Sequence, residues 1–186
     1  MKPEELISDA QHRMDRSVEA TRNEFNTVRT GRASAALLDR IQIDYYGQRT
    51  PLKQLATINV PEPRMLTIQP FDPSSLKSIE KAIQESDLGL TPSNDGKIVR
   101  LPIPQLTEER RKELVRVVRQ LAEDGRVAVR NVRRDAIHHL KELADNGDVG
   151  ADEEHRAEDR VQKLTDEHVH AIDDLLKHKE AEIMEV

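Results

Sequence analysis

Arginines gather on one face of the segment between residues 106 and 145. On a helix that turns by 100° per residue, with Arg126 set to zero, Arg130 falls at about 40°, Arg133 at about 340° and Arg134 at about 80°. A guanidinium group binds phosphate oxygens through paired N–H groups and also stacks on bases. The spacing therefore predicts a basic ridge, Arg126 to Arg134, that suits contact with the phosphate backbone of a nucleic acid.

The same ridge has a second interpretation, as a solvated face of a helical adaptor that binds only proteins. Residues 106–145 hold 10 Lys and Arg against 8 Asp and Glu, whereas residues 152–186 hold 5 against 12. The acidic segment can neutralise the ridge through pairs one turn apart or across a helical bundle. The net charge of -6 speaks against a nucleic-acid partner, but its distribution leaves the middle segment locally basic. The residues alone leave both interpretations open.

Residue types that carry out catalysis are sparse. The absence of cysteine excludes thiol nucleophiles and Cys-based zinc sites. The neighbours His138 and His139, and the alternate pair His168 and His170, do not place two imidazoles on one helix face. A hydrolase acting on peptidyl- or aminoacyl-tRNA would need a nucleophile beside a base, and no such pair is visible. We therefore expect a protein that is not an enzyme, with no catalytic residue, no metal site and no cofactor.

Three long segments show the apolar repeat of an amphipathic helix, at residues 4–29, 106–145 and 152–184. Thr107 suits the N-cap of the second helix. Gly125 lies inside its apolar stripe, where glycine costs about 1 kcal/mol relative to alanine, and we expect it to mark a close approach between helices. A glycine-containing break at residues 146–150 separates the last two helices, which indicates an antiparallel bundle.

The stretch from residue 32 to residue 104 differs from the rest because it is rich in proline and in short β-prone runs. These runs are predicted at residues 41–46, 57–60, 65–69 and 98–103, and a short helix is predicted from Asp72 to Ser86. Tyr45-Tyr46-Gly47 is either a platform on which RNA bases stack or part of a core. Alternation along a strand puts the two rings on opposite faces, so we expect at least one in the core.

The predicted fold class is α+β. An elongated three-helix bundle, residues 1–30 and 105–186, carries an inserted small β/α/β domain, residues 31–104. The chain crosses between these parts at Thr30-Gly31 and at Pro104-Gln105, which favours a two-strand hinge, the alternative being rigid packing. No apolar run approaches the roughly 18 residues of a membrane span, and the first ten residues do not read as a signal peptide. We expect a cytoplasmic protein that does not bind membranes.

Several short motifs together resemble one known family across nearly the whole chain. The first is VRTGRAS at residues 28–34, at the end of the first helix. In the middle stretch lie IDYYG (43–47), TP (50–51), QLA (54–56), EKAI (80–83) and SDLGL (86–90). In the last two helices lie LTEERR (106–111), VRNVRR (129–134), KLTD (163–166) and HKE (178–180). The chain is similar to the bacterial ribosome recycling factor family.

This resemblance implies an L-shaped monomer that works after translation termination. It implies that the factor, with elongation factor G and GTP, dissociates the spent ribosome and releases it from messenger RNA and deacylated transfer RNA. It implies that the bundle docks on the ribosomal RNA of the large subunit, whereas the small domain is mobile and is met by elongation factor G. Carried over to matching positions, the RNA-facing residues are Arg29, Arg32, Arg110, Arg130 and Arg133.

Overall fold

The computed structural model describes residues 1–185, and these divide into two compact units. The first unit consists of Met1–Phe25 and Arg116–Glu180, and the second of Asn26–Val115 and the residues from Ala181 onward. The boundaries predicted from the sequence, at residues 30/31 and 104/105, both fall inside the second unit. The domain limits and the hinge therefore stay predictions.

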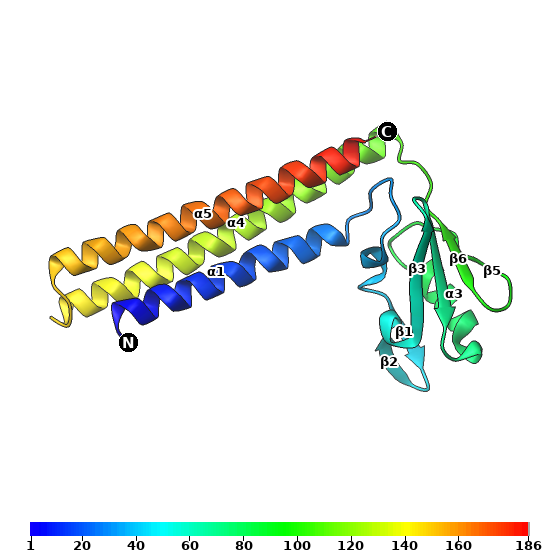
Figure 1. The fold of residues 1–186 in the computed structure, drawn as a ribbon, viewed down its shortest axis with the longest axis horizontal. Coiled ribbons are helices and arrows are strands. Elements are labelled where there is room, and N and C mark those ends of the chain that lie inside the picture. Colours follow the sequence, from blue (N-terminus) through cyan, green and yellow to red (C-terminus); the bar gives the residue numbers. More distant parts are fainter. Residues whose placement is uncertain (186) are drawn as a thin grey trace. The chain divides into compact units, whose positions relative to one another are not determined.

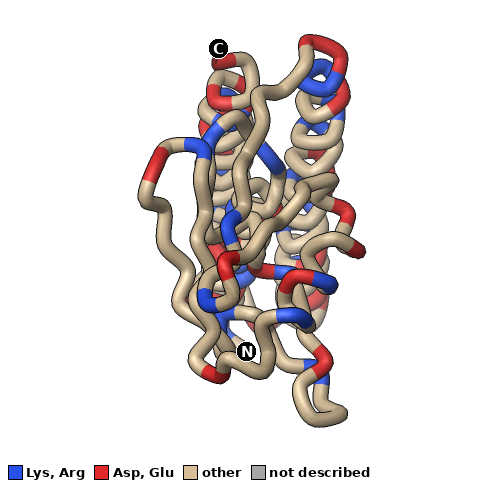
Figure 2. The backbone as a smooth tube through the Cα atoms, turned by 90° about the vertical axis from the view of Figure 1, so that its right-hand side faces the viewer, with Lys and Arg blue, Asp and Glu red and all other residues tan. Residues whose placement is uncertain are grey.

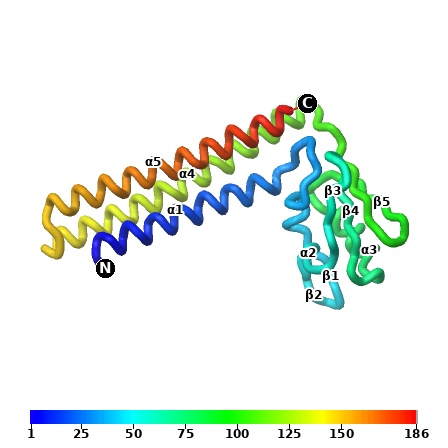
Figure 3. The backbone as a smooth tube through the Cα atoms, in the orientation of Figure 1, coloured from blue at the N-terminus to red at the C-terminus, as the bar shows by residue number. Residues whose placement is uncertain are grey.

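Three long helices confirm the predicted bundle: α1 (Pro3–Asn26), α4 (Glu108–Asp145) and α5 (Ala151–Met184). In the first unit they lie side by side (Figures 1 and 3). α1 ends at Asn26, three residues before the predicted end at residue 29. Val28 continues the apolar repeat and is buried, although it lies in the turn that follows the helix. Periodicity alone does not separate these two cases.

The core of the first unit is a narrow apolar seam along the helices. From α1 it contains seven buried residues: Leu6, Ile7, Ala10, Met14, Val18, Thr21 and Phe25. On α4, Ala122 and Val129 are fully buried, whereas Leu121 and Ala128, which steps of four and three residues from Gly125 predict to be in the core, are only half-buried. The prediction was wrong by one position at each of these points, because a helix in contact with two neighbours buries a face wider than a single line of residues.

Gly125 marks a point of close approach between helices, as predicted. A Cβ atom at this position would lie 2.2 Å from Thr21 Oγ1 of α1 and 3.1 Å from Ile172 Cδ1 of α5. Thr21 turns its hydroxyl toward its own helix and donates a hydrogen bond to the Ser17 carbonyl oxygen at 2.9 Å. Side chains from two helices therefore fill the space beside the α-carbon of Gly125.

Both ends of α4 are closed by local hydrogen bonds. Thr107 accepts a hydrogen bond from the Arg110 backbone N–H at 3.1 Å through its hydroxyl oxygen, which confirms it as the N-cap. At the other end Gly147 has φ +78°, and the Asp148 N–H donates to the Leu143 carbonyl oxygen at 2.9 Å. This is the glycine-dependent way of ending a helix, and it starts the short turn that leads into α5.

The second unit contains two antiparallel sheets and a short helix. β1 (Gln42–Tyr45) and β2 (Gln48–Pro51) form a hairpin. The other sheet has the order β3-β4-β6-β5, from β3 (Ala56–Glu62), β4 (Met65–Pro70), β5 (Ser93–Asn94) and β6 (Val99–Pro102). α3 (Leu76–Gln84) follows a 3-10 turn, η2 (Pro73–Ser75), which Asp72 caps by accepting from the Ser74 N–H at 2.9 Å. Two further short elements are η1 (Ala35–Leu38) and α2 (Leu52–Leu55).

One apolar core joins the hairpin, α3 and the larger sheet. It includes Ile43 from β1, Ile79 and Ile83 from α3, Ile68 from β4 and Leu101 from β6. This confirms the predicted β/α/β arrangement. The sequence did not reveal β2, whose residues Gln-Arg-Thr-Pro lack apolar alternation, nor β5, which has only two residues.

The two neighbouring tyrosines have different environments. Tyr45 is half-buried, and its hydroxyl donates a hydrogen bond to Asp72 Oδ2 at 2.7 Å. This bond raises the pKa of Tyr45 and contributes to lowering the pKa of Asp72, which its bond from Ser74 lowers most. Tyr46 is 83% exposed at the tip of the hairpin, where it adopts φ +50°. Only Tyr45 is tied into the small unit.

Candidate RNA-docking surface

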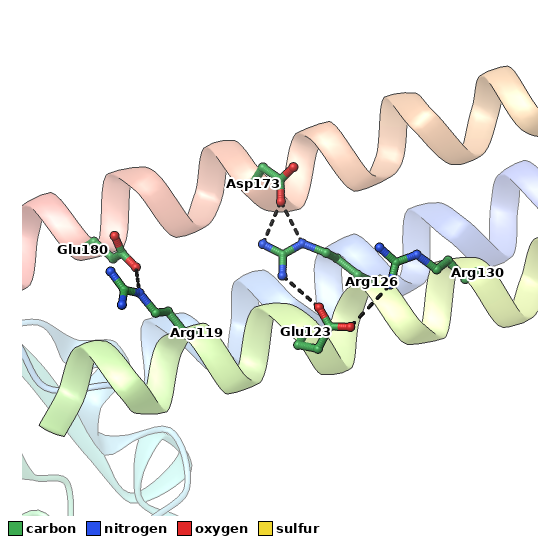
Figure 4. Close-up of polar contacts among 6 residues, drawn as sticks. All are labelled: Arg119, Glu123, Arg126, Arg130, Asp173 and Glu180. Carbon is green, nitrogen blue, oxygen red and sulfur yellow. Dashed lines mark hydrogen bonds and ion pairs between the residues drawn. The ribbon is translucent and has the colours of Figure 1, made fainter.

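The predicted ridge arginines lie along α4, and they differ in what faces them. Acidic residues occur among the basic ones along the bundle helices (Figure 2). Some of these acids lie on α5, beside α4, and others on α4 itself. Figure 4 shows six of the side chains: three arginines of α4 with Glu123 of α4 and with Asp173 and Glu180 of α5.

Arg126 is held by carboxylates on two sides. Its Nε donates to Asp173 Oδ1 of α5 at 2.7 Å, and its Nη1 donates to Glu123 Oε2, one turn earlier on α4, at 3.1 Å. The side chain is only 19% exposed. Burial acts to lower the pKa of the Arg126 guanidinium, but the bonds from Asp173 and Glu123 outweigh burial, and the pKa is raised. This arginine remains charged while largely withdrawn from solvent.

Two further arginines of α4 in the first unit, Arg119 and Arg130, pair with carboxylates and are more exposed than Arg126. Arg119 donates to Glu180 Oε1 of α5 at 2.6 Å, and this bond raises its pKa. Arg130 donates through Nη1 to Glu123 Oε1 at 3.4 Å, and its side chain is 42% exposed. Arg119, Arg126 and Arg130 are called the paired arginines below.

Beyond Arg130 the arginines of α4 have no carboxylate partner among the described residues. Arg133 donates to the neutral Gln162 Oε1 of α5 at 3.3 Å. Arg134 is exposed, and within residues 1–185 it has neither a hydrogen bond nor an ion pair. Arg133 and Arg134 are called the unpaired arginines below. Their guanidinium groups are available to a phosphate without displacement of an acid.

Arg29, Arg32 and Arg110, which we call the junction arginines, belong to the second unit. Arg29 donates through Nη2 to the Pro104 carbonyl oxygen at 3.0 Å, while its buried Nε has no hydrogen-bond partner in the described structure. Burial lowers the pKa of the Arg29 guanidinium, and the charge of Arg110 lowers it further. A buried N–H without a partner, next to a second cation, favours the binding of an anion.

The other two junction arginines pair with acids on exposed surface. Arg32 contacts Glu185 at 2.6 Å, and Arg110 contacts Glu113 at 2.8 Å. Exposed pairs of this kind contribute little and exchange easily for another anion.

Two of the predicted hinge residues, Thr30 and Gln105, accept hydrogen bonds through their side chains. The hydroxyl of Thr30 accepts from the Arg32 N–H at 3.2 Å, and the side-chain oxygen of Gln105 lies 2.8 Å from Arg64 Nη2. A Cβ atom on Gly31 would meet nothing within 4 Å. The bond from Arg29 to the Pro104 carbonyl links the two chain crossings.

His168, one of the histidines whose sequence spacing does not suit a metal, contacts an acid of a neighbouring helix. His168 is 11% exposed, and its Nε2 lies 2.6 Å from Asp15 Oδ1 of α1. Within the described part of the chain, no group of three or more His, Cys, Asp or Glu side chains is arranged to hold a metal ion. None of the described helices is long and apolar enough to cross a membrane.

Sequence reasoning missed the carboxylates that decide which arginines are free. Asp173 is 47 residues from Arg126, and Glu180 is 61 residues from Arg119. Only Glu123 had a local signal, since it lies three residues before Arg126 on the ridge. In one of the two interpretations that the sequence left open, the acidic third helix neutralises the ridge, but the sequence did not show which arginines would pair.

A two-unit α+β protein with an arginine-bearing bundle helix is the class that the fold defines. The family model described as ribosome recycling factor matches residues 21–184. The ribosome-recycling factor of Rubrobacter xylanophilus is 59% identical over 180 residues, covering 97% of this chain and 97% of that protein. The ribosome-recycling factor of Thermosynechococcus vestitus is 56% identical over 97% of this chain and 99% of its own length.

Solved structures of the same family share the fold. A solution structure of the ribosome recycling factor has a TM-score of 0.79 and 44% identity, covering 100% of this chain and 99% of its own. The second is the T. thermophilus ribosome recycling factor, from models of that factor and the E. coli elongation factor G bound to the E. coli post-termination complex. It has a TM-score of 0.70 and 49% identity over 100% of both chains. This chain belongs to the ribosome recycling factor family.

Proposed function

We propose that this protein docks on ribosomal RNA of the large subunit in the post-termination ribosome. With elongation factor G and GTP it promotes dissociation of that ribosome and its release from messenger RNA and deacylated transfer RNA. It is a cytoplasmic monomer without catalytic activity of its own. The bundle, residues 1–30 and 105–186, carries the RNA-docking surface, and residues 31–104 form the part that elongation factor G meets.

The observation that carries the RNA-docking part is the state of Arg133 and Arg134. The chain has 35 Asp and Glu against 29 Lys and Arg, and α5 beside these arginines is rich in acid. Even so, within the described residues neither guanidinium is paired with a carboxylate. Arginines left open in acidic surroundings suit a ligand that brings its own negative charge, such as a phosphate backbone.

The junction arginines support a second contact with the same ligand. Arg29 has an unsatisfied buried N–H, and the charge of the neighbouring Arg110 disfavours its own. A phosphate placed there relieves both. The related factor from T. thermophilus, described with the ribosome and elongation factor G, supports the choice of partners.

The test is binding to vacant 70S ribosomes at two salt concentrations. Arg133→Ala should weaken binding about tenfold or more, because a charge-assisted bond to phosphate contributes about 1.5–3 kcal/mol. The matched control is Arg16→Ala, which removes an exposed arginine of α1 that also has no ion pair within residues 1–185. Equal binding of wild type and Arg133→Ala would leave the ridge a solvated face and favour a protein-only adaptor.

A further inference from the structure

Glu123 of α4 bridges two arginines of the proposed docking surface. Its Oε2 accepts a hydrogen bond from Arg126 at 3.1 Å, and its Oε1 accepts one from Arg130 at 3.4 Å (Figure 4). The side chain is 48% exposed, so it is not fixed by packing. The bridge therefore rests on the two arginines alone.

Arg126 has no free edge to offer to a phosphate. Nε and Nη2 both lie 2.7 Å from Asp173 Oδ1, and Nη1 contacts Glu123. A bidentate phosphate contact needs two neighbouring N–H groups that point into open space. We therefore assign Arg126, which the sequence placed in the RNA contact, a structural role: it joins α4 to α5 and positions Glu123.

Arg130, unlike Arg126, has guanidinium N–H groups that are accessible to a phosphate. It uses only Nη1, in a bond of 3.4 Å that is close to the limit for a hydrogen bond, and it is 42% exposed. Its other guanidinium nitrogens make no hydrogen bond within residues 1–185. A phosphate can reach them, but Glu123 already bonds to the same group and repels a second anion.

We propose that Glu123 is a positioning residue that competes with RNA phosphate for Arg130. This inference rests on the proposed function. In the free protein the carboxylate holds Arg130, and on docking a phosphate takes its place. The competitor keeps affinity below the maximum that the arginines would allow, and it favours release of a factor that must act repeatedly.

The proposal has a signature in the salt dependence of binding. When phosphate replaces Glu123 on Arg130, the total of paired charges does not change. In the wild type the carboxylate freed from Arg130 attracts a cation from solution, which offsets one counterion released by the RNA. A neutral residue at position 123 removes this offset. The slope of log K against log salt should therefore become steeper by about one. A residue with a purely structural role would not change this slope.

The experiment compares Glu123→Gln, Asp124→Asn and Arg133→Ala with wild type on vacant 70S ribosomes across a salt series. Because the chain has no cysteine, Asp148→Cys in the exposed α4–α5 turn gives one labelling position for fluorescence anisotropy. Asp124→Asn is the matched control: it makes the same charge change one residue away, at a carboxylate that within residues 1–185 accepts a hydrogen bond only from Gln120, at 3.0 Å. The melting temperature of each variant is measured to check that the fold is retained.

We expect Glu123→Gln to bind about three- to tenfold more tightly at low salt, with a slower off-rate and the steeper slope. Asp124→Asn should show less than half of this gain, and an Arg130→Gln background should abolish the difference. Equal gains in both carboxylate variants, or no gain at position 123, overturn the proposal while loss of binding in Arg133→Ala still supports the docking surface. If Arg133→Ala binds like wild type, or wild type does not bind, the proposed function fails and this inference fails with it.

Discussion

Two stretches of α4 carry the same residue type and differ in what the neighbouring helix presents. Around Arg126, Asp173 of α5 reaches across the bundle and withdraws the guanidinium from solvent. Around Arg133, seven residues or about two turns later, α5 offers only the amide of Gln162. The comparison teaches that a basic ridge is not one surface. The facing helix decides which arginines hold the bundle together and which are open to a ligand.

The largest expected effect is on stability, and it tests the close approach of the helices at Gly125, next to Arg126. Gly125→Ala places a methyl group 2.2 Å from Thr21 Oγ1, and we expect a loss of about 2 kcal/mol in unfolding free energy. For a chain of this length the melting temperature should fall by about 4–8 °C, measured by calorimetry.

The matching rescue identifies the cause of that loss. Thr21→Ala removes the atom that the new methyl group meets, so the double variant should recover most of the stability. A Gly125→Ala protein as stable as wild type would show that the helices can separate there without cost.

A smaller effect on stability distinguishes Arg126 from Arg133 directly. Arg126→Gln leaves Asp173 and Glu123 without their partner, and it should cost about 1 kcal/mol of stability in urea unfolding. Arg133→Gln should stay within about 0.5 kcal/mol of wild type, because it breaks only a long bond to a neutral group. Equal losses would mean that both arginines are structural, and the comparison would fail.

Substitution of an unpaired arginine should change ribosome binding and leave stability unchanged. Arg134→Gln removes one phosphate contact, and we expect affinity for 70S ribosomes to fall by a few-fold while the salt slope decreases by about one. Arg116→Gln is the control, since Arg116 is an exposed arginine of α4 without a recorded ion pair in the described chain. An equal fall in both variants would extend contact along all of α4 and contradict a localised ridge.

The smallest effect concerns a paired arginine on exposed surface. Arg160 of α5 donates to Glu4 of α1, and this bond and the arginine's charge lower the pKa of Glu4. Because the folded pKa lies below the unfolded value of about 4.3, the pair stabilises the fold above that pH and its contribution is lost as pH falls through the folded pKa.

Glu4→Gln removes that contribution. Melting temperatures measured from pH 7 down to pH 3 should decline less steeply in the variant, with only a small difference between variant and wild type at pH 7. Parallel curves for variant and wild type would show that this pair has no measurable effect.

The sequence was sufficient to predict features that depend on a repeated apolar spacing or on a residue type at one position. The helices followed from apolar spacing, the Thr107 cap from its residue type, and the close approach at Gly125 from a costly glycine inside a stripe. It was insufficient where a partner lies far along the chain, as with Arg126 and Asp173, because periodicity carries no information about pairs between helices. β2 was missed since Gln48–Pro51 has little apolar character and is fixed only by its hairpin partner β1.

For the candidate site, the sequence predicted the residue type and the helix face, and the RNA contact itself stays a prediction. That arginines of α4 form a ridge followed from helical geometry, whereas the ribosome and elongation factor G came from the resemblance and not from any residue pattern. The pairing state of each arginine required coordinates. The role of Glu123 was visible in the sequence only as an interruption of the ridge.

The absence of a side chain at Gly125 also fixes the axial register of α1, α4 and α5 relative to one another. If α4 slid by four residues, about 6 Å, Leu121 or Val129 would stand where Thr21 and Ile172 leave no space for a Cβ atom. Movement of α4 along its own axis relative to α1 and α5 is therefore blocked in both directions.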